Sequence, residues 1–309
     1  MKLFRRRTVA SLRLDPGTAV RPTDTLTVTV EVDEAVPGVT AARIELGYVN
    51  GFRYHWAGKQ AALASQGQDS LLTAGQLGTN YGGDKDSDAW VSVIDAPLTV
   101  AAGVLGSGPQ QVQLRLPSWA PGTAGEVVRW EARLHVERSG KDTVVAESFT
   151  VLSVAPDPAP TSAELPLIQG ERALANSILF EIETERGTYR PGEEVRGTVA
   201  VTPRDPVDRS ALLAVWFQQL TDSHPVEKNP TLGPSESFVR PMTSIAKDVR
   251  LVQGQRSEFP FALTLPADAM PTLEAVHSSV RWFVQIKVEF SGMTGAIERA
   301  ERGIVVHTG

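Results

Sequence analysis

The chain contains no cysteine among its 309 residues, which excludes disulfide bonds, thiolate metal sites and cysteine nucleophiles. It also lacks any run of about 18 apolar residues, so no membrane-spanning helix is expected. The basic start is not followed by the apolar segment of a secretory signal. We therefore expect a cytoplasmic protein that is stabilised by burial of apolar side chains.

An excess of positive charge is also missing, because 30 lysines and arginines face 36 acidic residues. A phosphate-binding surface needs a dense basic field, so no nucleic-acid partner is predicted. The usual motifs of acyl transfer and nucleotide binding are absent, and none of the five histidines has the spacing of a helical metal site. We therefore predict no catalytic residues and no enzyme, although a site assembled from distant polar residues stays open.

Apolar and polar residues alternate through both halves of the chain. Trp130, Ala132, Leu134 and Val136 alternate with charged residues, and residues 282–290 repeat this pattern with Trp282 at its start. Period two is typical of strands with one buried side. Many short strands separated by proline and glycine predict an all-β fold of two tandem antiparallel β-sandwich domains of the immunoglobulin-like kind. Trp130, Trp216 and Trp282 are expected to be buried.

A proline-rich stretch at residues 154–166 divides the chain. Proline removes backbone donors and favours extended neighbours, so this stretch predicts a linker. We expect a first domain at residues 1–153, a linker at 154–172 and a second domain at 173–309. The first domain is predicted to carry a long inserted loop at about residues 59–88, which is rich in glycine, glutamine, serine and aspartate.

Three short motifs recur in the same order in both halves. R-P-T-D-T-L-T-V-T-V from Arg21 corresponds to R-P-G-E-E-V-R-G-T-V from Arg190, and V-Q-L-R-L-P corresponds to F-A-L-T-L-P. An Arg-Trp pair followed by alternation and Ser-Gly also occurs twice, at Trp130 and at Trp282. The pattern indicates an internal repeat.

The second half has the more specific motifs. T-Y-R-P-G-E-E-V-R-G-T-V-A-V at residues 188–201 combines an aromatic residue, a Pro-Gly turn and an alternating strand. F-P-F-A-L-T-L-P and V-R-W-F-V-Q-I-K-V follow at residues 259–266 and 280–288. Together they resemble the arrestin-like family, which includes bacterial sporulation-control proteins. The resemblance covers residues 177–309 and implies an adaptor or regulatory scaffold that binds partner proteins without catalysis. In the first half, Thr23 replaces the turn glycine.

One acidic segment has the spacing of a metal site. Asp84, Asp86 and Asp88 lie on alternate residues, and Asp95 follows at the twelfth position. Calcium loops place oxygen ligands at these positions, so Ca²⁺ is the single cofactor considered. Ala89 stands where such a loop needs glycine, and a strand-like run follows. A solvated acidic loop is the competing interpretation.

Partner contacts are predicted at two places. Tyr54, His55 and Trp56, at the start of the long loop, are candidates for an exposed aromatic surface that binds proteins. The basic residues near the start offer a peripheral contact with an anionic membrane; they are Lys2, Arg5, Arg6 and Arg7. The alternative function is a carbohydrate- or calcium-binding β-sandwich of a surface protein. The sequence does not indicate an oligomeric state or the identity of a partner.

Overall fold

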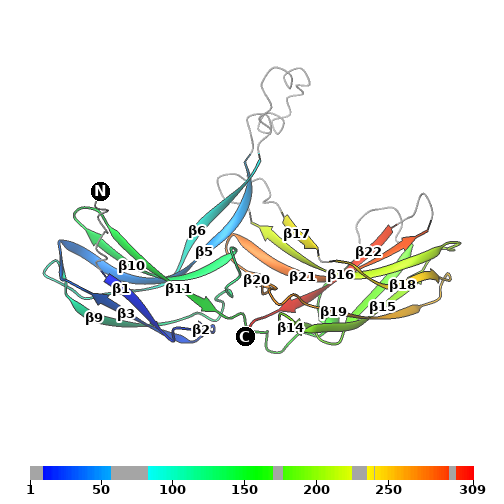
Figure 1. Cartoon of the computed structure of the whole chain (residues 1–309), viewed down its shortest axis with the longest axis horizontal. Coiled ribbons are helices and arrows are strands. Elements are labelled where there is room, and N and C mark those ends of the chain that lie inside the picture. Colours follow the sequence, from blue (N-terminus) through cyan, green and yellow to red (C-terminus); the bar gives the residue numbers. More distant parts are fainter. Residues whose placement is uncertain (1–9, 57–82, 170–176, 225–234, 240, 292–296) are drawn as a thin grey trace, which may run out of the picture. The chain divides into compact units, whose positions relative to one another are not determined.

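The computed structural model describes residues 10–56, 83–169, 177–224, 235–239, 241–291 and 297–309. The chain divides into two compact units (Figure 1). The first unit contains Met1–Val154, Ser223–Pro234 and Glu274–Ser278, and the second contains Ala155–Asp222, Ser235–Leu273 and Ser279–Gly309. Each unit consists of sheets that are antiparallel except for one short parallel strand pair, with apolar residues between the sheets, so the predicted all-β sandwich class is confirmed.

The first unit has two main sheets. One has the order β1-β3-β9, with β1 (Ala10–Asp15), β3 (Thr25–Val32) and β9 (Gly108–Arg115). The other has the order β2-β11-β10-β5-β6, with β2 (Ala19–Val20), β11 (Thr143–Val151), β10 (Val128–Arg138), β5 (Val39–Trp56) and β6 (Gly83–Pro97). A small third sheet joins β4 (Val36–Pro37), β8 (Val104–Leu105) and β7 (Val100–Ala101).

The second unit has the same kind of arrangement. Its smaller sheet has the order β13-β15-β19, with β13 (Ile178–Thr184), β15 (Glu194–Pro203) and β19 (Ser257–Thr264). The path β12-β22-β21-β16-β17 forms the larger sheet, with β12 (Leu167–Gln169), β22 (Ile297–Val306), β21 (Ser278–Phe290), β16 (Ser210–Ser223) and β17 (Ser235–Val239). Three further strands pair with members of this path: β14 (Thr188–Tyr189), β18 (Thr243–Arg250) and β20 (Leu273–Glu274).

Alternation along β10 and β21 places their apolar residues in the two cores. Trp130 and Trp282 are each 1% exposed, as expected from the sequence. On β10 buried residues alternate with half-buried charged ones, because successive side chains of a strand point to opposite faces. One face of the larger sheet in each unit therefore covers the core, while the other carries polar residues.

Part of the predicted linker is structured and belongs to the second unit. A 3-10 turn, η1 (Ser162–Glu164), precedes β12, which pairs with β22. The buried Arg302 of β22 donates hydrogen bonds to the carbonyl of Leu165, at 2.6 Å, and to that of Ile182, at 2.8 Å. Burial lowers the pKa of Arg302 from its ordinary value. These bonds attach the linker to both sheets of the second unit.

A reciprocal pair of hydrogen bonds occurs in each unit. In the first unit, the Thr123 N–H donates to the Val151 carbonyl at 2.8 Å, and the Val151 N–H donates to Thr123 Oγ1 at 2.9 Å. In the second unit, Thr272 and Val306 make the same two bonds at 2.8 and 2.9 Å. Thr123 and Thr272 are separated in the sequence by the same number of residues as the two copies of the Leu-Pro motif.

The buried tryptophans make a second matching contact. Trp130 Nε1 donates to the Pro121 carbonyl, and Trp282 Nε1 donates to the Met270 carbonyl, each at 2.8 Å. Both acceptors lie in the loop that follows the Leu-Pro motif. A buried indole N–H needs an acceptor, so each tryptophan also fixes this loop.

The turn before β3 contains a strained residue. Thr23 has a φ of 76°, and Gly192 has a φ of 81° in the corresponding turn before β15. A β-branched residue is disfavoured in this left-handed region by about 1–2 kcal/mol. Thr23→Gly is therefore expected to raise the free energy of unfolding by about 1 kcal/mol, after the entropy cost of glycine is subtracted. Denaturant unfolding followed by tryptophan fluorescence measures this change.

The second unit supplies the matched control. A Cβ placed on Gly192 would meet nothing within 4 Å, so Gly192→Thr adds backbone strain without a clash. It is expected to lower the free energy of unfolding by a similar amount. If both substitutions changed the free energy of unfolding in the same direction, this account of the two turns would be wrong.

Candidate functional site

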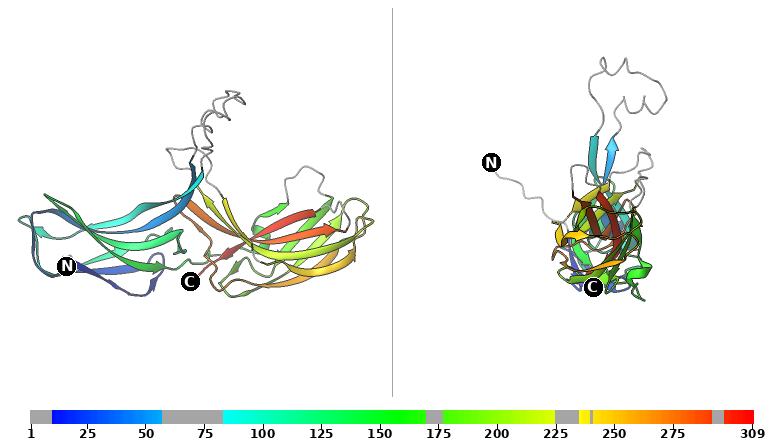
Figure 2. Two further views of the ribbon diagram at one scale, coloured as in Figure 1. Left: turned by 45° about the horizontal axis from the view of Figure 1, so that its top comes forward. Right: turned by 90° about the vertical axis from the view of Figure 1, so that its right-hand side faces the viewer.

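The polar face of the larger sheet in the first unit carries a connected group of side chains. Its members are Arg43 and Glu45 on β5, Trp90 on β6, and Glu131, Arg133, His135 and Glu137 on β10. We call this group the β5–β6–β10 face. The strands β5 and β6 lie side by side in both views of Figure 2, and the register pairs β5 with β10 on its other side.

The indole ring of Trp90, a residue of β6, lies against the backbone of β5 at Gly47. A Cβ on Gly47 would be 2.7 Å from the Trp90 ring, so the absence of a side chain there makes room for the indole. Trp90 Nε1 donates to Glu45 Oε2 at 3.2 Å. The guanidinium of Arg133 stacks on the ring, 3.6 Å from its centroid. Cation–π attraction and a hydrogen bond thus hold Trp90 in one orientation on an otherwise open face.

Glu45 is the centre of the charged contacts, although it is only 8% exposed. Arg43 Nε donates to Glu45 Oε1 at 2.7 Å, and Arg43 also pairs with Glu137. Burial alone would raise the pKa of Glu45, but hydrogen bonds from Arg43 and Trp90 and the charges of His135 and Arg43 hold it below its ordinary value. His135 Nε2 lies 3.3 Å from Glu45 Oε2 without hydrogen-bond geometry.

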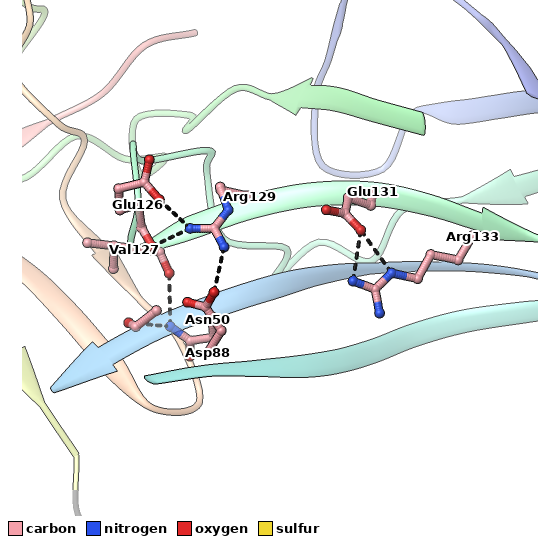
Figure 3. Close-up of polar contacts among 8 residues, drawn as sticks. Asn50, Asp88, Glu126, Val127, Arg129, Glu131 and Arg133 are labelled. Atoms are coloured by element: carbon pink, nitrogen blue, oxygen red, sulfur yellow. Dashed lines mark hydrogen bonds and ion pairs between the residues drawn. The ribbon is translucent and has the colours of Figure 1, made fainter. Parts of the chain in front are cut away.

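Arginines of β10 bind carboxylates along the same strand and across the sheet. Arg133 pairs with Glu131 at 2.8 Å, and Arg129 reaches Asp88 of β6 at 2.9 Å (Figure 3). Arg129 also pairs with Glu126 in the loop before β10. Planar guanidinium groups held by carboxylates present fixed donors and little free net charge. The face therefore has a preformed shape with both signs of charge.

A buried asparagine joins three segments of the first unit at one end of this face. Asn50 is 0% exposed, and its Nδ2 donates to the Val127 carbonyl at 3.0 Å and to Ser278 Oγ at 2.6 Å. Asn50 Oδ1 accepts the His277 N–H at 2.7 Å. Figure 3 shows Asn50 beneath Val127. Because all its polar atoms are used, this residue fixes β5 to the loop before β10 and to Glu274–Ser278.

The acidic residues of the calcium hypothesis lie on strand β6. Asp86 binds Arg53 at 2.8 Å and Asp88 binds Arg129, while Asp95 lies opposite Glu45 in the register. Asp95 follows Asp88 by seven positions along the strand, which corresponds to roughly 23 Å. Within the described residues, no group of three or more histidine or acidic side chains is placed to hold a metal ion. The side chain of Asp84 lies outside the described part.

Several other predicted contacts also lie outside the described residues. These are Lys2, Arg5, Arg6 and Arg7, residues 57–82 of the predicted long loop, and the side chains of Tyr54, His55 and Trp56. The backbone of β5 continues through Trp56, which pairs with Gly83 of β6. Residues 83–88 are thus strand and not loop, because ladder pairing with β5 extends that far.

The sequence indicated only part of the β5–β6–β10 face. Alternation predicted that Arg133 and His135 lie on the polar side of a strand, and they do. It did not single out Trp90, Glu45 or Arg43. The available signal was a tryptophan within the strand-like run W-V-S-V-I and a charged pair on alternate residues of another strand.

Comparisons with known proteins give a limited result. No family model matches the chain, and no curated protein matches it. Among solved structures, it is similar to Spo0M, a sporulation control protein from Bacillus subtilis, with 22% identity and a TM-score of 0.34. The match covers 43% of this chain and 50% of Spo0M, so it spans half the length of that protein. Within the described residues, no helix has the length and apolarity needed to cross a membrane.

Proposed function

We propose that this chain is a non-enzymatic adaptor that binds partner proteins through the β5–β6–β10 face and through neighbouring edge strands. The observation that carries the proposal is the Arg133–Trp90 stack, held by Glu45 on an open sheet face. Tryptophan and arginine are enriched among residues that dominate binding energies in protein interfaces. A side chain that is already fixed loses little entropy when a partner binds.

The sheet edges support the same function. Within the described part, β6 pairs with β5 alone, so one edge of β6 has free backbone groups. An added partner strand gains affinity from such groups and specificity from neighbouring side chains. The resemblance of residues 177–309 to the arrestin-like family also favours an adaptor. The same bonds at Thr123 and Thr272 support our inference that both sandwiches follow one repeated sequence plan.

A carbohydrate- or calcium-binding surface protein is the second candidate, and the structure favours it less. Sugar binding needs an exposed aromatic ring, whereas Arg133 covers Trp90 on the polar face. Trp119 is 63% exposed, but it lies in the loop between β9 and β10 and away from the ladder of that face.

Substitutions on the face test the proposal. Trp90→Ala and Arg133→Ala are each expected to weaken partner binding roughly 30-fold, the effect of removing a dominant contact of about 2 kcal/mol. The measurement is affinity capture from the native lysate with quantitative mass spectrometry, followed by titration of each captured partner.

Trp119→Ala is the matched control, because it removes an exposed tryptophan from another surface. It is expected to retain every partner. Circular dichroism of all three variants checks that they are folded. If folded Trp90→Ala and Arg133→Ala capture the same partners as the unmodified chain with equal affinity, the proposed face is wrong.

A further inference from the structure

The second unit has a groove of about 800 Å³ on the outer face of its larger sheet. Side chains from five neighbouring strands line it, including Ile168 of β12, Glu301 of β22, Gln285 of β21, and Trp216 and Gln218 of β16. Ile168 lies opposite Glu301, and Glu301 lies opposite Gln285, so these residues form a row across the sheet. Four strand spacings correspond to roughly 19 Å, the length of about six extended residues.

Two buried polar atoms of residues that line this groove have no hydrogen-bond partner within the described part of the chain. Trp216 is 3% exposed, and its Nε1 donor is unpaired. The Oε1 acceptor of Gln218 is also buried and unpaired, although the Nε2 group of Gln218 donates to Ser237. In the first unit, by contrast, Trp90 Nε1 has an acceptor in Glu45. Unpaired buried groups destabilise the free protein, so a ligand that pairs with them gains affinity.

Two exposed apolar side chains and two charged side chains also line the groove. Ile168 is 40% exposed and Met242 is 55% exposed, and both line the groove. Methionine adapts its shape to different apolar partners. Arg299 is exposed and has no ion pair within the described part of the chain, whereas Glu301 accepts a hydrogen bond from Gln285. The groove lining therefore carries one charge of each sign, and the guanidinium of Arg299 is available to pair with a carboxylate of a ligand.

We propose that this groove binds an extended segment of a partner protein that carries an aliphatic side chain and a nearby carboxylate. A main-chain amide supplies both the acceptor for Trp216 and the donor for Gln218. The aliphatic side chain packs against Ile168 and Met242, and the carboxylate pairs with Arg299. A sugar is less suitable, because the ring of Trp216 is too buried to stack. The inference rests on the proposed function only in that the ligand is a protein segment.

A library of random linear peptides displayed on phage, selected against the intact chain, tests this groove. Selected peptides are expected to share an aliphatic residue close to an acidic one. Calorimetric titration of the most enriched peptide should show roughly five- to tenfold weaker binding to Trp216→Phe, which loses the donor but keeps a ring. Arg299→Ala should weaken binding roughly tenfold or more.

The nuclear magnetic resonance signal of the Trp216 indole N–H gives a direct readout. It is assigned by its loss in Trp216→Phe and is expected to shift on addition of the peptide. Trp119→Ala is the control and should bind the peptide as the unmodified chain does. Because Arg299 is exposed, Arg299→Ala is expected to fold. This variant therefore tests the groove even if Trp216→Phe does not fold.

Absence of any enriched peptide, or equal affinity of the folded variants, would overturn the groove assignment. Binding of an oligosaccharide in place of peptides would overturn it as well. Continued dependence of captured partners on Trp90 would show that the adaptor function stands while the groove assignment fails.

Discussion

Replacing Trp130 by alanine is expected to lower the free energy of unfolding of the first unit by about 3–5 kcal/mol. Trp130 is 1% exposed and packs between Tyr48 and Phe149, with ring centroids 5.2 and 5.7 Å away. Its loss leaves a cavity and removes the hydrogen bond to the Pro121 carbonyl. Denaturant unfolding monitored by far-ultraviolet circular dichroism measures the effect.

Two further variants separate packing from hydrogen bonding. Trp130→Phe keeps most of the ring volume and loses the N–H, so it is expected to destabilise the unit less than alanine does. Trp119→Ala should change stability by less than about 0.5 kcal/mol, because Trp119 is 63% exposed. A small effect of Trp130→Ala, similar to that of Trp119→Ala, would show that Trp130 is not a core residue.

Replacing Asn50 by alanine is the second substitution with a large expected effect, about 2–5 kcal/mol of lost stability. The change removes the partners of the Val127 carbonyl and of the His277 N–H. Both groups lie at a position where Asn50 is fully buried, so water does not replace the lost bonds. Hydrogen exchange at the His277 amide should accelerate in the variant, which mass spectrometry can measure.

Ser278→Ala is the control for this prediction. It removes a single acceptor of Asn50 Nδ2, which keeps its bond to the Val127 carbonyl. The expected loss of stability is about 1 kcal/mol. If Asn50→Ala destabilises no more than Ser278→Ala, the asparagine does not join these segments as described.

The strands and cores could be predicted from the sequence because burial imposes period two on each strand. Trp130 and Trp282 were placed correctly by their alternating neighbours. Trp216 was correctly predicted to be buried, but it lies on the outer face of β16. Its neighbour Phe217 packs against Trp282 in the core, with ring centroids 6.4 Å apart. Since β16 is apolar on both faces, alternation does not distinguish them.

The β5–β6–β10 face was harder to predict because it depends on strand register. Glu45 and Trp90 are 45 residues apart in the sequence. The β5–β6 ladder has an irregularity between Leu46 and Gly47, close to this contact, and no local motif specifies it. The groove of the second unit likewise combines residues from strands that are distant in the chain. The sequence pattern within one strand predicts which of its faces is buried. The pairing between strands determines which side chains meet to form a site.

The open edge of β6 has a consequence for behaviour at high concentration. Asp86, Asp88 and Asp95 are exposed along this strand, and Pro97 ends it. Exposed charged side chains along an edge disfavour its pairing with a second copy of the same edge, and Pro97 has no backbone N–H to donate. We therefore expect the edge of β6 to resist pairing with a second copy of itself.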